Sequence, residues 1–161
     1  GIGRFPNTVL HLIGSSPVPA VQAEWKNLDA DALRKLRESV MREALAKKEL
    51  PADAWGRVEK AIEIDATLNL LKAEGIEATY HACDVGDREA LSILLDQIRQ
   101  NSGPIVGVIH GAGFEKASRF SKKKPDLVRR TVRAKLDGAL NLMELTKSDA
   151  LRNFVVFGSI R

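Results

Sequence analysis

The residues best suited to chemistry in this sequence come directly after four short apolar runs. Serine and aspartate side chains form hydrogen bonds, and glycine lets a bound molecule approach the backbone. If the runs are strands of one parallel sheet, their carboxyl ends lie along a common edge, where such sheets bind ligands. One such segment could be a simple turn, but four of them favour a binding edge for a flat cofactor. The segments are Gly14-Ser15-Ser16, Cys83-Asp84-Val85, His110-Gly111-Ala112-Gly113 and Gly158-Ser159.

The four apolar runs have the composition of strands that are covered on both faces. They occupy residues 8–13, 78–82, 105–109 and 154–157. Between the last three runs, apolar residues recur at helical spacing, first after Asp87, an expected N-cap, and then after Pro125. Strands that alternate with amphipathic helices predict an α/β fold with a doubly wound parallel sheet.

The connection between the first two runs is longer than an ordinary crossover. It contains two apolar stripes of helical spacing, which Leu50-Pro51 separates. Asn27 or Asp29 can cap the first helix, and Gly75 can end the second. We expect the second helix to be the crossover helix of the sheet. The first, within residues 18–50, is then a helical insertion with a charged outer face, which the two tryptophans anchor.

Composition excludes several classes of protein. With 161 residues, 44% hydrophobic and 29% charged, the chain is typical of a folded globular domain rather than of a disordered one. No apolar run approaches the roughly 20 residues of a membrane helix, and no signal peptide is visible. A single cysteine excludes an internal disulfide and cysteine-based zinc sites. A net charge of +4 with 5% aromatic residues argues against nucleic-acid binding. We expect a cytoplasmic protein without nucleic-acid or membrane partners and without a metal site.

The same segments, in the same order, resemble the short-chain dehydrogenase/reductase family. They are most similar to the ketoreductase domains of modular polyketide and polyunsaturated-fatty-acid synthases. Those domains carry an H-G-A-G segment, a K-x-x-G pattern on the following helix and an F-S-S or F-G-S strand end. The resemblance runs from about Thr8 to the last residue, apart from the inserted helix. The matching residues are Gly14-Ser15-Ser16-Pro17, Tyr80–Val85, Val108–Gly113, Ala134–Gly138 and Phe157–Ser159.

The resemblance implies a Rossmann-like fold and a nicotinamide cofactor, NADPH, with NADH left open. Asp84 would accept a hydrogen bond from the adenine amino group, beside the backbone of Val85. The glycines after the third strand would leave room for the ribose. Without a cofactor, Asp84 would be a turn former and these glycines a tight turn. The implied cofactor-binding residues are Gly14, Ser15, Ser16, Asp84, Val85, His110, Gly111, Ala112 and Gly113.

Two catalytic residues follow from the same resemblance. Ser159 would donate a hydrogen bond to the substrate carbonyl oxygen, and Lys135 would belong to the proton relay and organise a catalytic tyrosine. Without the resemblance, Ser159 would be a turn residue and Lys135 a solvated helix lysine. We expect His110 to be a structural strand-end residue rather than a base, and Cys83 to be a small apolar residue.

The implied reaction is reduction of a β-ketoacyl thioester, held on an acyl carrier protein, to its β-hydroxyacyl form within a larger synthase. Other domains of that synthase would be further partners. One alternative is a noncatalytic, structural reductase-like subdomain of a synthase; Ser159 and Lys135 favour catalysis over it. A helix-mediated interaction domain built on the charged insertion has the least support, because such faces are usually just solvated.

The sequence departs from the family pattern in several places. Ser15 stands where many relatives have an arginine for the 2′-phosphate, and Glu115-Lys116-Ala117 replaces an L-D-D signature. The first strand with its Gly-rich turn, and a tyrosine about a dozen residues after Ser159, are not among these residues; Tyr80 is on another strand. We therefore expect residues 1–161 to be part of a longer Rossmann-type ketoreductase domain and to be inactive alone. Without a central first strand, the second and fourth strands would face each other across a gap.

Overall fold

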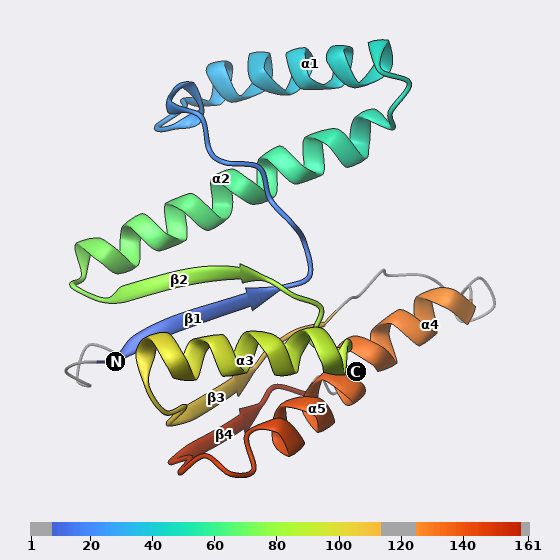
Figure 1. Ribbon diagram of the computed structural model, residues 1–161. Helices are drawn as coiled ribbons and strands as arrows, with labels where there is room; N and C mark the ends of the chain where they lie inside the picture. Colours follow the sequence, from blue (N-terminus) through green and yellow to red (C-terminus); the bar gives the residue numbers. More distant parts are fainter. Residues whose placement is uncertain (1–7, 114–124, 159–161) are drawn as a thin grey trace. The chain divides into compact units, whose positions relative to one another are not determined.

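Helices and strands alternate along the computed structural model, which describes residues 8–113 and 125–158 (Figure 1). The strands are β1 (Val9–Gly14), β2 (Glu77–Ala82), β3 (Gly107–His110) and β4 (Asn153–Val156). The helices are the 3₁₀ turn η2 (Ala23–Trp25), α1 (Ala30–Ala46), α2 (Pro51–Ala73), α3 (Arg88–Ser102), α4 (Pro125–Val132), the π-helical turn η4 (Arg133–Asp137) and α5 (Gly138–Leu145). The described chain forms two compact units: residues 8–12 and 16–80, and residues 13–15, 81–113 and 125–158.

The described strands pair as two parallel, two-stranded sheets. β1 pairs with β2, and both run in the same direction (Figure 1). β3 pairs with β4 in parallel register, from Gly107 opposite Asn153 to His110 opposite Val156. These are the neighbours expected for strands two with three and four with five of a doubly wound sheet. No described residues of β1 and β3 pair with each other, and the expected gap between strands two and four stays a prediction.

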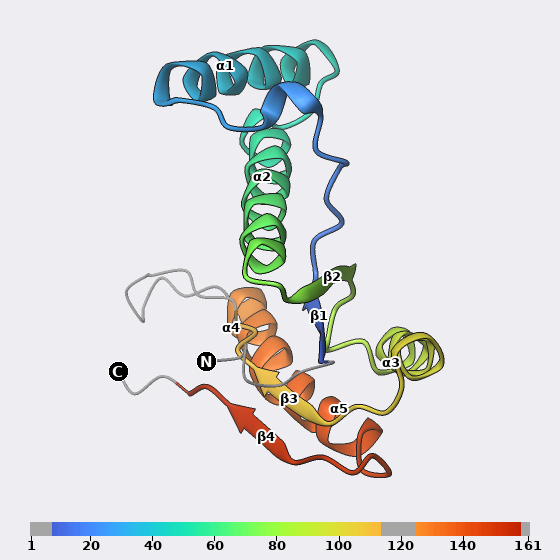
Figure 2. The ribbon, with the colours of Figure 1, turned by 90° about the vertical axis from the view of Figure 1, so that its left-hand side faces the viewer.

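The first unit contains the helical hairpin α1–α2 (Figure 2). Asp29 caps α1, its Oδ1 accepting the N–H of Ala32 at 2.8 Å, while the other expected cap, Asn27, has a left-handed backbone with φ of 55°. α2 begins at Pro51, whose missing N–H costs nothing there, and is followed by Gly75 at φ of 74°. Both predicted helices are therefore confirmed.

A small separate core holds the hairpin together. Trp25, Trp55 and Val58 are buried, and half-buried apolar side chains of α1, of α2 and of Val21, just before η2, pack around them. The Trp55 indole N–H donates to Glu59 at 3.1 Å, and the Arg37 guanidinium lies 5.9 Å from the Trp55 ring centroid. The tryptophans thus fix α1 against α2, and the outer face of α1 carries exposed ion pairs such as Arg34 with Asp31.

The main core of the second unit lies between α3, α5 and the β3–β4 sheet. Asp87 caps α3, accepting the N–H of Ala90 at 3.1 Å, and Gly103 ends the helix at φ of 87°. The predicted apolar stripe of α3 is buried there with Val108 and Leu142. The core residues of this stripe are Leu91, Leu94, Leu95 and Ile98.

Two features differ from the sequence-based expectation. β3 begins at Gly107 rather than at residue 105, although the carbonyl of Val106 already accepts the N–H of Arg152 at 2.8 Å. The single helix expected after Pro125 contains the π turn η4 between α4 and α5. A π turn adds one residue to the hydrogen-bonded ring, a change that a three-and-four apolar spacing does not reveal. No helix in the described part of the chain is long and apolar enough to cross a membrane.

Candidate functional site

The candidate site is built on the end of β3 and the π turn η4, both in the second unit. The His110 side chain is 3% exposed, and its Nε2 lies 3.1 Å from the backbone oxygen of Lys135. A carbonyl oxygen can only accept, so His110 Nε2 carries the proton and donates it. The first residue of the H-G-A-G segment therefore binds the backbone of the expected catalytic lysine. This agrees with the expectation of a structural strand-end residue.

The side chain of Lys135 passes over the last residue of the same segment. A Cβ atom at Gly113 would lie 3.0 Å from Lys135 Cε and 4.0 Å from Lys135 Nζ. The bare backbone of Gly113 thus makes room for the lysine stem. Lys135 is half-buried rather than fully solvated, and it lies against the carboxyl end of β3.

Gly138, three residues after Lys135, brings the helix close to the neighbouring loop. A Cβ atom there would lie 2.6 Å from Val85 Cγ2 and 3.1 Å from His110 Cε1. Real side chains do not approach this closely, so the last position of the K-x-x-G pattern requires glycine for packing. Asn141 on α5 strengthens the junction, because its Nδ2 donates to the carbonyl of Val85 at 2.9 Å.

Asp84 stands in a turn directly after β2. Its Oδ1 accepts the N–H of Gly86 at 2.9 Å, and its Oδ2 lies 3.3 Å from the guanidinium Nε of Arg133 in η4. The Asp84 side chain is 44% exposed and keeps accessible carboxylate surface. Arg133 lies so close to Gly86 that a Cβ there would be 2.5 Å from its Cγ. The turn-former interpretation is thus correct, and it leaves the carboxylate able to accept a further donor.

The ends of β3 and β4 lie next to each other. The Phe157 N–H donates to the carbonyl of His110 at 2.9 Å, and a Cβ atom at Gly111 would be 3.8 Å from the Phe157 ring. Gly158 follows, exposed. Ser159, the expected carbonyl-binding residue, lies outside the described residues.

The first predicted segment is divided between the two units. Gly14 and Ser15 belong to the second, where the Gly14 carbonyl accepts the N–H of Cys83 at 2.9 Å. Ser16 belongs to the first, where its carbonyl accepts the Tyr80 hydroxyl at 2.8 Å.

Burial raises the pKa of the Cys83 thiol above its ordinary value, and Asp87 and Asp84 raise it further. Cys83 is buried as a small apolar residue, as expected.

Two residues of the site were not foreseen from the sequence. Arg133 contributes the cation beside Asp84, and Asn141 ties α5 to Val85. Arg133 precedes Lys135 in the sequence, and Asn141 follows it on α5. The sequence contains no signal that separates them from ordinary surface residues of an amphipathic helix. Among the described residues, no group of three His, Cys, Asp or Glu side chains is placed to hold a metal ion.

Comparisons with known proteins place these features in a family. Residues 54–161 match the family model described as KR domain. Erythronolide synthase EryA2 of Saccharopolyspora erythraea is 39% identical over 108 residues, which are 67% of this chain and 3% of that synthase. A phenolphthiocerol synthesis polyketide synthase of Mycobacterium bovis is 38% identical over 104 residues, which are 65% of this chain and 5% of that protein.

Solved structures of ketoreductases also resemble this chain. The ketoreductase from the first module of phoslactomycin biosynthesis in Streptomyces sp. HK803 is 35% identical, with a TM-score of 0.53, over 62% of this chain and 22% of that one. A ketoreductase domain from the bacillaene assembly line, 23% identical, shares the fold with a TM-score of 0.60 over 94% of this chain and 26% of that one. The α/β arrangement with parallel sheets thus matches Rossmann-like ketoreductases. The chain belongs to the KR domain family, the ketoreductases of polyketide synthases within the short-chain dehydrogenase/reductase group.

Proposed function

We propose that these residues form the cofactor edge and part of the proton relay of a ketoreductase that reduces a β-ketoacyl thioester to its β-hydroxyacyl form. The observation that carries the proposal is the position of Lys135, whose carbonyl is bound by His110 and whose stem crosses Gly113. A merely solvated helix lysine needs neither contact. Family membership implies a nicotinamide cofactor, and we propose NADPH as the one used.

The residues of the second unit fit such a cofactor. Gly111 and Gly113 are exposed and Ala112 is half-buried, so a flat group can lie against bare backbone after β3. Asp84 offers a half-exposed carboxylate that can accept a hydrogen bond from an adenine amino group while it still binds Gly86. When bound, a nicotinamide cofactor supplies the hydride that reduces the carbonyl carbon. We propose Gly14, Ser15 and Val85 as further cofactor contacts within the second unit. The expected contact of Ser16, which belongs to the first unit, stays a prediction.

The chain's own residues would stabilise the charge that develops on the substrate oxygen. The Ser159 hydroxyl would donate a hydrogen bond to that oxygen. The Lys135 ammonium would stabilise the negative charge of the developing alkoxide and of the catalytic tyrosine that donates the proton. Fixed donors of this kind cost no reorganisation during the reaction. The family's catalytic tyrosine would come from residues after Arg161, and residues 1–161 alone would be inactive.

The partners follow from the same proposal. The curated relatives are large polyketide synthases, of which this chain spans a small percentage. We propose that the substrate arrives on an acyl carrier protein and that other synthase domains flank residues 1–161, in the cytoplasm. A net charge of +4 is compatible with an acidic carrier protein.

NADPH consumption by the full-length protein, with a β-ketoacyl thioester mimic as substrate, tests the proposal. Ser159→Ala and Lys135→Gln are each expected to lower kcat by about 100-fold or more, because each removes a fixed donor or charge from the reacting oxygen. The matched controls are Ser148→Ala and Lys147→Gln, two exposed positions shortly after the end of α5. Both controls should keep full activity. Wild-type activity in the Ser159 and Lys135 variants would contradict the assigned roles.

The alternative is a structural reductase-like subdomain of a synthase. The sequence has a single tyrosine, Tyr80, and its hydroxyl is held by the Ser16 carbonyl in the first unit. Burial raises the pKa of Tyr80 above its ordinary value. The Tyr80 hydroxyl is thus already engaged as a hydrogen-bond donor to the backbone. Absence of both turnover and NADPH binding in the full-length protein would favour this alternative.

A further inference from the structure

We propose that His110 is a positioning residue for Lys135: it holds the π turn so that the lysine side chain crosses Gly113 at the end of β3. This inference rests on the proposed function, because it assigns a purpose to the position of Lys135. It goes further by giving the buried imidazole a task in the reaction without direct contact to substrate or cofactor.

The geometry of His110 supports this role. The imidazole is 3% exposed. Breaking the hydrogen bond of such a buried donor costs free energy, because water does not replace the lost acceptor. Its acceptor is the backbone oxygen of Lys135, 3.1 Å away, rather than a side chain. A bond to the backbone fixes where the Cα of Lys135 lies, and so where its side chain begins.

The acceptor lies in an unusual element. Lys135 is the middle residue of η4 (Arg133–Asp137), where the helix adopts π geometry, and the N–H of Gly138 donates to the carbonyl of Arg133, five residues back. Single π turns are rare, occur mostly inside α-helices and are frequent at functional sites. His110 contacts this turn from β3, which is hydrogen-bonded to β4. A return to α-helical geometry would rotate the residues of one side of the turn by about 100° relative to the other.

Two glycines complete the arrangement. Gly138 lets η4 and α5 lie close to the His110 ring, since a Cβ there would be 3.1 Å from His110 Cε1. Gly113 leaves the path of the lysine stem open, since a Cβ there would be 3.0 Å from Lys135 Cε. The strand end and the helix therefore meet through His110, and the lysine is fixed at its carbonyl and along its stem.

The test compares three substitutions in the full-length protein. His110→Gln places an amide N–H near the position of Nε2 and is expected to keep kcat near the wild-type value. His110→Asn is too short to reach the Lys135 carbonyl, and His110→Leu has no donor. Both are expected to lower kcat by about 100-fold with little change in the KM values for NADPH and thioester, since a misplaced group of this kind costs about that much. Circular dichroism and thermal unfolding identify the variants that fold.

The outcomes separate the two proposals. A wild-type protein without turnover overturns the proposed function and this inference with it. An active wild type with equal kcat in folded Gln, Asn and Leu variants overturns this inference alone. An equal loss of kcat in His110→Asn and His110→Gln also overturns this inference, because the glutamine N–H donor would then fail to restore the position of Lys135.

A second measurement needs no variant to fold. In protein labelled with ¹⁵N-histidine, the nitrogen shifts of His110, assigned through its backbone amide, report which ring nitrogen carries the proton. We expect protonated Nε2. A bare Nε2 with protonated Nδ1 would overturn the inference, because a bare nitrogen cannot donate to a carbonyl.

Discussion

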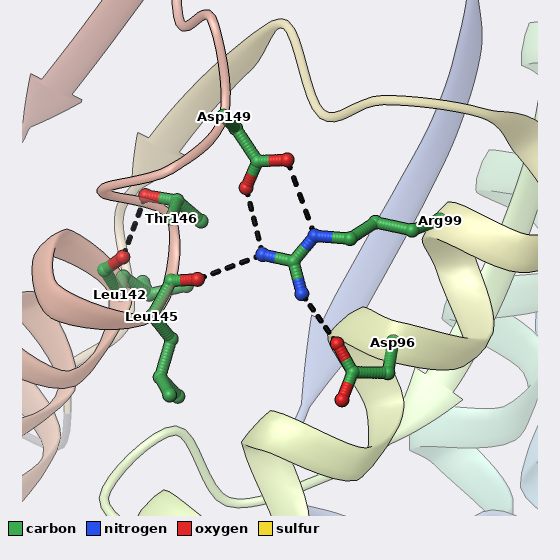
Figure 3. A network of polar contacts seen from close by, with 6 residues as sticks. All are labelled: Asp96, Arg99, Leu142, Leu145, Thr146 and Asp149. Atoms are coloured by element: carbon green, nitrogen blue, oxygen red, sulfur yellow. Dashed lines mark hydrogen bonds and ion pairs between the residues drawn. The ribbon is translucent and has the colours of Figure 1, made fainter.

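The guanidinium of Arg99 joins α3 to the chain that follows α5 (Figure 3). It donates to both carboxylate oxygens of Asp149, at 3.1 and 2.7 Å, and to the carbonyl of Leu145 at 2.7 Å. A fourth hydrogen bond, at 2.7 Å, reaches Asp96 within α3. The Asp149 side chain is 7% exposed, whereas that of Asp96 is 61% exposed. The bidentate Asp149 pair is thus desolvated, and the Asp96 pair is a surface ion pair.

This difference predicts unequal effects of removing the two carboxylates. Asp149→Ala removes the buried partner of Arg99, whose side chain is 25% exposed, and should lower the free energy of unfolding by about 3 kcal/mol. Asp96→Ala, the matched control, should cost less than about 1 kcal/mol, because exposed ion pairs contribute little. Urea unfolding followed by circular dichroism measures both. Equal losses in the two variants would mean that the buried pair contributes no more than the surface pair.

At the level of single residues, the sequence predicted part of the candidate site. The small and polar residues after the strands, and Lys135 with Gly138, were expected, and the structure brings Val85, His110, Gly113 and Lys135 together. Their roles toward a cofactor and a substrate remain predictions. The bond from His110 to a backbone carbonyl could not be foreseen, because a carbonyl is present at every residue and only the fold selects one.

At the level of elements, two helical glycines serve different purposes. Gly138 opens α5 and has Val85 and His110 close to where its Cβ would be. Gly56 lies in α2, where a Cβ would meet nothing within 4 Å. Glycine weakens a helix through the conformational entropy it loses on folding. In α2 no packing contact requires glycine, whereas in α5 a larger residue would not fit.

The same substitution should therefore have opposite effects at the two sites. Gly138→Ala is expected to destabilise the protein by about 1–3 kcal/mol, because an added methyl forces Val85 or the helix to move. Gly56→Ala should stabilise it by up to about 1 kcal/mol, because alanine has the higher helix propensity. Differential scanning calorimetry of both variants checks this. A Gly138→Ala variant as stable as wild type would show that the loop at Val85 yields easily.

The helices and strands themselves were largely predictable. Apolar runs, Asp29 and Asp87 as caps, and Gly75 as a helix end are local signals, and local signals decide where most elements begin and end. The π turn was missed, because apolar residues spaced three and four apart do not distinguish a π turn from an ordinary α-helical turn. The start of β3 was missed by two residues, because pairing with β4 sets it.

At the scale of the whole molecule, the described residues carry two separate cores. The cluster around Trp25, Trp55 and Val58 belongs to the first unit, and the cluster around Leu91 and Leu142 belongs to the second. No buried residue is shared between these two clusters. Regions with separate cores can open separately, each with its own free energy.

We therefore expect core substitutions to act locally. Trp55→Ala should remove about 3–5 kcal/mol from the stability of the first unit, and Leu91→Ala about 2–5 kcal/mol from that of the second. By hydrogen–deuterium exchange, amides of α1 and α2 should exchange faster in Trp55→Ala while those of α3 keep their rates, and the reverse should hold for Leu91→Ala. Leu45→Ala and Ile93→Ala, at positions 65% and 55% exposed, are matched controls that should change neither. If each core variant accelerates exchange in both sets of helices equally, the two cores unfold as one cooperative structure, and the division into units describes packing but not stability.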